Sequence, residues 1–158
     1  MSAKHSAVVS VCGDAESIAM LRWEWAREDD PSIGPWRRDQ VFADSVDEWM
    51  SAPCRTVLVA CLGAAPVGMV CLTEHTRLPS PREQAAGVWG YLGHLFVLED
   101  YRRRQVGQRL ITEAIAHADR SGHSKVVLSP TRKSVPLYVR CGFVAENNLM
   151  TRRKGVGR

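Results

Sequence analysis

The sequence lacks any run of about 18 apolar residues, the length that an α-helix needs to cross a bilayer. Residues 1–10 also lack the basic and then apolar layout of a signal peptide. We therefore expect no membrane partner and a cytoplasmic location. Of the 158 residues, 45% are hydrophobic and 24% charged, which is typical of a folded domain that needs no metal or disulfide. The length predicts a single domain over residues 1–158.

Cysteine is scarce, and its spacing excludes two classes of site. The five cysteines are odd in number and contain no Cys-x-x-Cys pair, so neither a zinc site nor a disulfide framework is supported. None is spaced with a histidine in a way that singles out a thiol nucleophile. We expect small buried hydrophobic side chains in a reducing compartment, and no metal site. The five are Cys12, Cys54, Cys61, Cys71 and Cys141.

A strongly basic body is also lacking. The net charge is +4, and four positive charges lie in a C-terminal tail, about residues 151–158, that we expect to fray. The body is therefore near neutral, which argues against nucleic-acid binding. The remaining basic cluster, Arg102–Arg104, suits a small polyanion better than a duplex.

Hydrophobic periodicity predicts the element order β–α–α–β–β–β–α–β–α–β. The third helix lies between two strands, and this order implies a parallel crossover. Neither a linker nor an internal repeat divides the chain. We expect strands over residues 7–11, 56–62, 67–73, 88–97, 125–129 and 143–150, and helices over about 15–27, 38–50, 106–121 and 135–141.

Tryptophans gather in the first two predicted helices and in the loop that joins them. Large aromatic side chains are usually core residues, so we expect packing here. The functional alternative is a substrate pocket between these helices and their loop. Glu28, Asp29 and Asp30 could then attract a cationic substrate, although an exposed acidic helix end is the simpler interpretation.

The stretch from His94 to Arg109 predicts an anion site. An apolar strand end leads through a basic turn into an amphipathic helix, whose first N–H groups lack intrahelical partners. Gly107 allows the chain to approach a ligand closely. Ligands in such sheets gather where the connections from neighbouring strands diverge. We therefore expect a phosphate to bind here, the alternative being a solvated arginine cluster at a helix start.

Two blocks of this sequence resemble a known family. Residues 91–111, Tyr-Leu-Gly-His-Leu-Phe-Val-Leu-Glu-Asp-Tyr-Arg-Arg-Arg-Gln-Val-Gly-Gln-Arg-Leu-Ile, resemble the acetyl-CoA-binding region of the GCN5-related N-acetyltransferase (GNAT) superfamily. Residues 131–143, ending Pro-Leu-Tyr-Val-Arg-Cys-Gly-Phe, resemble its helix that carries a tyrosine. The resemblance implies an α/β (α+β) fold, with a mixed, mostly antiparallel sheet of six to seven strands flanked by about four helices.

The same resemblance implies an activity. It is the direct transfer of an acetyl group from acetyl-CoA to a primary amine of a small molecule or peptide, within a ternary complex. The protein could be a monomer or a homodimer. A non-catalytic acyl-CoA-binding or sensor module on the same fold is the alternative.

The resemblance also implies cofactor-binding residues. The family's phosphate-loop pattern, Gln/Arg-x-x-Gly-x-Gly/Ala, maps onto residues 102–107, with Gln105 where the first glycine is usual. A side chain in that slot requires a compatible backbone conformation. Main-chain groups at the strand end would hold the pantetheine arm. The full set is Leu95, Phe96, Val97, Arg102, Arg103, Arg104, Gln105, Val106, Gly107, Gln108, Thr131, Ser134, Tyr138 and Arg140.

For catalysis, the resemblance makes Tyr138 the general acid that protonates the departing thiolate. The general base is left open. Many relatives carry a glutamate or histidine where this chain has Gly93 and Tyr91. His94 could serve if a bulge re-aims it, Glu74 on the neighbouring strand is a second candidate, and a water relay is a third.

Overall fold

The computed structural model describes residues 7–11, 14–82, 87–146 and 149–152. Five strands form one sheet in the order β1-β2-β3-β4-β5, antiparallel from β1 to β4 and parallel between β4 and β5. The elements are β1 (Val8–Val11), α1 (Ala15–Asp29), α2 (Gln40–Met50), β2 (Arg55–Leu62), β3 (Ala65–Thr76), β4 (Val88–Val97), the 3-10 turn η1 (Glu99–Tyr101), α3 (Val106–Arg120), β5 (Val126–Val127) and α4 (Val135–Arg140).

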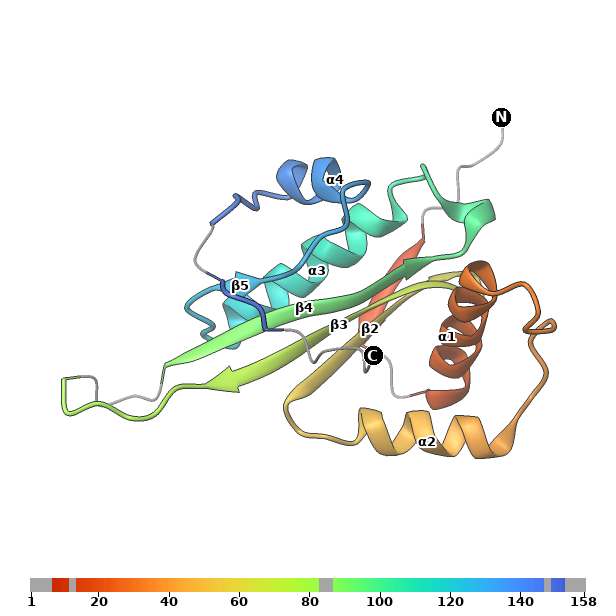
Figure 1. Cartoon of the computed structure of the whole chain (residues 1–158), viewed down its shortest axis with the longest axis horizontal. Coiled ribbons are helices and arrows are strands. Elements are labelled where there is room, and N and C mark those ends of the chain that lie inside the picture. The colour runs from red at the N-terminus through yellow and green to blue at the C-terminus, as the bar shows by residue number, and fades with distance from the viewer. Residues whose placement is uncertain (1–6, 12–13, 83–86, 147–148, 153–158) are drawn as a thin grey trace, which may run out of the picture.

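The sheet buries a separate apolar cluster on each face. Figure 1 shows α3 and α4 over one face of the sheet and α1 and α2 over the other. Leu110 and Ile111 of α3 are fully buried against the first face. Leu21 of α1 is fully buried against the second. The sheet can bury a cluster on each face because successive side chains along a strand point to opposite faces.

Local sequence signals position the helices and the first hairpin. The Asp14 carboxylate caps α1 by accepting from the Glu16 N–H at 3.0 Å, and Asp39 caps α2 by accepting from the Phe42 N–H at 2.9 Å. Gly63 has φ +61° in the β2–β3 turn, a conformation that glycine adopts without a steric cost.

The predicted order is confirmed up to α4, including the parallel crossover from β4 through α3 to β5. The prediction of six to seven strands is wrong, because the described residues form a sheet of five. The last strand, expected over residues 143–150, is absent from the described part of that segment. Val144 there is 79% exposed, and β5 has only two residues with which a further strand could pair. Residues 153–158, predicted to fray, lie outside the described part of the chain.

None of the helices in the described ranges combines the length and the apolar character that crossing a bilayer requires.

Candidate functional site

The first element of the site is a split between β4 and β5. These strands pair only at Gly90 with Val126 and at Tyr91 with Val127. Beyond Tyr91, the outer edge of β4 therefore has no strand partner in the described chain. Main-chain groups along such an edge can bind an extended ligand, although the Val97 carbonyl already accepts from Arg102 Nε at 2.8 Å. The predicted pantetheine residues Leu95, Phe96 and Val97 lie along this edge.

The second element is the loop that leads into α3. Arg103 and Gln105 both have left-handed backbones, with φ of 59° and 65°. Within the described chain, the N–H groups of residues 103–108 donate to no protein acceptor. Alternating left- and right-handed residues turn successive N–H groups to one side and form a concave nest for an anion. Gln105 thus adopts the left-handed backbone that a glycine would adopt, so its side chain does not prevent the loop conformation that the predicted anion site requires.

The three arginines of the loop have different partners. Arg102 donates through Nη2 to both carboxylate oxygens of Glu28, at 2.7 and 2.6 Å, and through Nε to the Val97 carbonyl at 2.8 Å. It therefore ties the loop to the end of α1. Arg103 and Arg104 are exposed and form no ion pair with any described residue. These two are the arginines that remain available to an anion.

The other predicted loop residues fix the loop against the core. Val106 is 5% exposed and anchors the start of α3. A Cβ on Gly107 would lie 3.4 Å from Leu137 Cδ2, so α4 packs close to α3 here. Gln108 is exposed, and its carbonyl accepts from the Thr112 hydroxyl at 2.8 Å.

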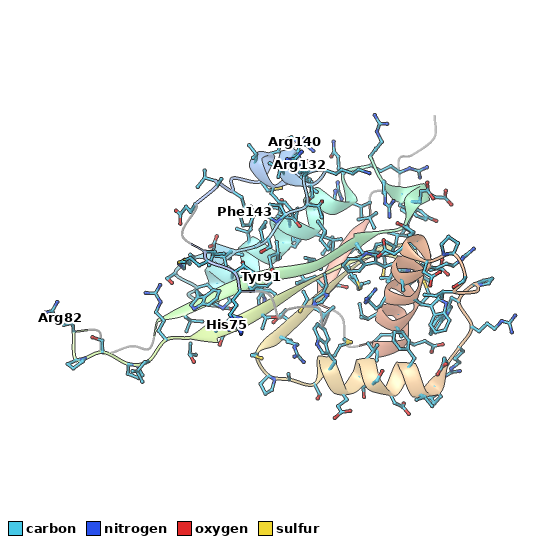
Figure 2. All side chains as sticks on the ribbon, in the orientation of Figure 1. His75, Arg82, Tyr91, Arg132, Arg140 and Phe143 are labelled. Carbon is cyan, nitrogen blue, oxygen red and sulfur yellow. The ribbon has the colours of Figure 1, made fainter. Side chains whose placement is uncertain are left out.

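The third element is α4 with the turn before it, which follows β5 on the far side of the split. Thr131 Oγ1 and Ser134 Oγ lie 3.0 Å apart, and Ser134 also donates to the Thr131 carbonyl at 3.0 Å. Figure 2 shows Arg132 and Arg140 together at α4, with Tyr91 on β4 beside β5. The hydroxyl pair and Arg140 thus belong to the segment that follows β5.

Tyr138 of α4 is half-buried and keeps its proton. Its ring packs edge-on against Phe143, with 5.7 Å between centroids. Burial raises the pKa of the phenol, and the neighbouring Tyr91 and Cys141 raise it further. The hydroxyl has no hydrogen-bond partner among the described residues. A neutral phenol of this kind can donate a proton to a leaving group.

His94 lies at a bulge in β4. Met69 pairs with Phe96 and Cys71 with Gly93, so His94 and Leu95 together face the single residue between Met69 and Cys71 on β3. The backbone of His94 is left-handed, with φ 56°. The bulge that could re-aim this side chain is therefore present.

The imidazole of His94 points toward α1 and α2. Its ring lies edge-on to Trp25 and Trp49, at 6.4 and 5.3 Å between centroids. Burial lowers its pKa, and the nearby guanidinium groups of Arg22 and Arg55 lower it further. The imidazole is neutral at neutral pH, which is the state that can accept a proton.

Glu74 is not brought together with His94. Its carboxylate contacts His123 Nε2 at 2.9 Å, and the His123 side chain is only 2% exposed. Leu72, two residues earlier on β3, belongs to the cluster under α3, so Glu74 shares that face by strand alternation. His94 lies on the opposite face.

Sequence reasoning missed Arg22 and Arg55, the cations beside His94. Arg22 could have been found, because Ile18, Arg22 and Trp25 recur at the spacing of one helical face. The Arg55 guanidinium lies 4.3 Å from the Trp49 ring centroid. No sequence signal links Arg55 to His94, because their proximity depends on packing between distant elements.

A model of the Acetyltransferase (GNAT) family matches residues 18–143. The chain belongs to the GNAT acetyltransferase family. The resemblance inferred from residues 91–111 and 131–143 is thereby confirmed. Membership supports acetyl transfer from an acyl-CoA as the general kind of activity.

Solved structures share the fold of this GNAT chain. A candidate acetyltransferase from Agrobacterium tumefaciens has a TM-score of 0.74 at 22% identity, covering 93% of this chain and 99% of its own. A Trypanosoma brucei acetyltransferase has a TM-score of 0.73 at 18% sequence identity, and the match covers 94% of this chain and 100% of that protein. A candidate acetyltransferase from Clostridium acetobutylicum, solved with acetyl-CoA, has a TM-score of 0.68 at 12% sequence identity. The match covers 94% of this chain and 95% of that protein. A comparison with curated protein sequences gave no match.

Proposed function

We propose that this protein is an acetyl-CoA-dependent N-acetyltransferase that acetylates a primary amine by direct transfer in a ternary complex. The observation that carries the proposal is the nest of free N–H groups over residues 103–108, placed beside the unpaired edge of β4. An anion nest next to an open strand edge suits a ligand with a diphosphate at one end and an extended amide arm at the other.

The chemical groups at this site are of the kinds that would bind such a cofactor. The N–H groups of residues 103–108, with Arg103 and Arg104, would hold the diphosphate. Main-chain groups of residues 95–97 would hold the pantetheine arm. Thr131, Ser134 and Arg140, in the segment that follows β5, would complete the set. When bound, acetyl-CoA supplies an acetyl group activated as a thioester.

Two side chains would move protons. The neutral imidazole of His94 accepts the proton that an ammonium must lose before its nitrogen can attack a carbonyl. The phenol of Tyr138 holds a proton at Oη and donates it to the group that leaves. We prefer His94 to Glu74 as the base because the Glu74 carboxylate is engaged with His123.

The direct test mixes the full chain with acetyl-CoA and a panel of amines, amino acids and peptide N-termini, and detects acetylated products by mass spectrometry. Turnover of at least one amine supports the proposal. Cofactor binding without any acetylated product would overturn it in favour of the non-catalytic acyl-CoA-binding module.

A further inference from the structure

A cavity of about 190 Å³ lies between α1, α2 and the sheet, on the face to which His94 points. An apolar protein cavity of about 150 Å³ is large enough to hold benzene. The space therefore fits one group of about the size of an aromatic ring. Its lining is Ile18, Arg22, Phe42, Ser45, Val46, Trp49, Val57, Met69, Val70, Cys71 and His94.

The lining of this cavity carries a positive charge. Of the described residues that line it, none is acidic and Arg22 is basic. The nearby acidic residues of α1 are engaged elsewhere, since Glu24 pairs with Arg27 at 3.0 Å and Glu28 pairs with Arg102 at 2.6 Å. A second cation buried without a carboxylate would be costly. A polycationic amine therefore does not suit this cavity.

Arg22 is available to an anion at the mouth of the cavity. Its guanidinium carbon lies 5.0 Å from the ring centroid of Trp25, and the side chain forms no ion pair with any described residue. A guanidinium held over an aromatic ring presents a planar fork of N–H donors that matches a carboxylate. His94 lines the same cavity, so one ligand could contact both groups.

We propose that the acceptor is a small amine that carries both a carboxylate and an apolar group of about the size of an aromatic ring, as a hydrophobic amino acid does. The apolar group fills the cavity, the carboxylate binds Arg22, and the amino group lies at His94. This assignment deepens the proposed acetyl transfer and rests on it for the reaction, but acceptor binding can be measured separately.

The binding test uses the full chain saturated with CoA, and titrates three probes by calorimetry. L-Phenylalanine should bind about ten-fold more tightly than 2-phenylethylamine, which lacks only the carboxylate. Spermidine should bind most weakly. Equal affinity for the first two probes, tighter binding of spermidine, or no binding of any probe would overturn the assignment.

A pair of variants tests the role of Arg22. Arg22→Gln should abolish the preference for L-phenylalanine over 2-phenylethylamine, because the affinity for L-phenylalanine falls about ten-fold relative to that for 2-phenylethylamine. The matched control is Arg27→Gln on the same helix, which should keep the preference because Arg27 pairs with Glu24 outside the cavity lining. An unchanged preference in Arg22→Gln would overturn the assignment.

The two proposals fail in different ways. Binding of L-phenylalanine with the predicted preference, but no acetylated product from any amine, would overturn the transfer reaction and leave the cavity assignment standing. Acetylation of amines without any preference for a carboxylate would overturn the cavity assignment and leave the transfer reaction standing.

Discussion

Replacing Gln105 with glycine should not weaken the fold, although glycine usually does. Gln105 has φ 65° and ψ 8°, and its side chain makes no capping hydrogen bond. A left-handed backbone costs a residue with a Cβ roughly 1–2 kcal/mol. Glycine removes that cost but adds roughly 0.5–1 kcal/mol of unfolded-state entropy. Gln105→Gly should therefore raise the free energy of unfolding by between about 0 and 1.5 kcal/mol.

The matched control is Gln108→Gly, an exposed position three residues later in the first turn of α3. Gln108 has a helical backbone, so glycine gains nothing at this position. Gln108→Gly should lower the free energy of unfolding by about 0.5–1 kcal/mol. Urea unfolding followed by circular dichroism should separate the two variants by about 0.5–2.5 kcal/mol. The reasoning is refuted if Gln105→Gly destabilises the protein as much as Gln108→Gly does. The affinity for acetyl-CoA should not fall in Gln105→Gly, because the anion donors are main-chain N–H groups.

Two further predictions concern His94 and Gly90. Because the pKa of His94 lies below its ordinary value of 6.5, the imidazole is mostly in its base form at pH 6.5, and the midpoint of the acid-side fall in kcat/KM should lie below pH 6.5. His94→Gln should remove this acid limb from the pH–rate profile, and an identical limb in the variant would exclude His94 as the base. A Cβ on Gly90 would lie 2.7 Å from Leu72 Cδ1 and 3.0 Å from His123 Nδ1, so Gly90→Ala should destabilise the protein by about 1–3 kcal/mol. The control is Gly34→Ala, because a Cβ on Gly34 would meet nothing within 4 Å. Its midpoint of thermal unfolding should be close to that of the wild type. Equal stability of the Gly34 and Gly90 variants would contradict the close packing at Gly90.

The elements that frame the cofactor loop could be read from the sequence. The predicted bounds of β4 and the start of α3 agree with the structure, because an unbroken β run and a regular apolar helix face meet at the basic turn. These signals are local, and local patterns predict element type well. The predicted strand over residues 143–150 was wrong. Such a strand needs a neighbouring strand to pair with, and β5, with two residues, is too short to be that partner.

The acceptor side of the site depends on contacts between distant residues. Glu28 and Arg102 are 74 positions apart, and the neighbours that lower the pKa of His94 come from α1 and the start of β2. Sequence analysis raised Glu28 as a possible attractor for a cationic substrate, whereas the structure pairs it with Arg102. The periodicity of a single helix contains no information about such pairings, so the sign of the charge at the cavity became visible only in the fold.

The central claim is that this GNAT chain catalyses transfer and that Tyr138 supplies the proton. The most direct measurement compares kcat and the acetyl-CoA dissociation constant for wild type, Tyr138→Phe and the control Tyr101→Phe, which keeps the ring that lies 5.6 Å from Arg104. We expect Tyr138→Phe to lower kcat by about 10²-fold or more with little change in cofactor affinity, and Tyr101→Phe to change neither. An unchanged kcat in Tyr138→Phe, or a loss explained entirely by weaker cofactor binding, would contradict the account.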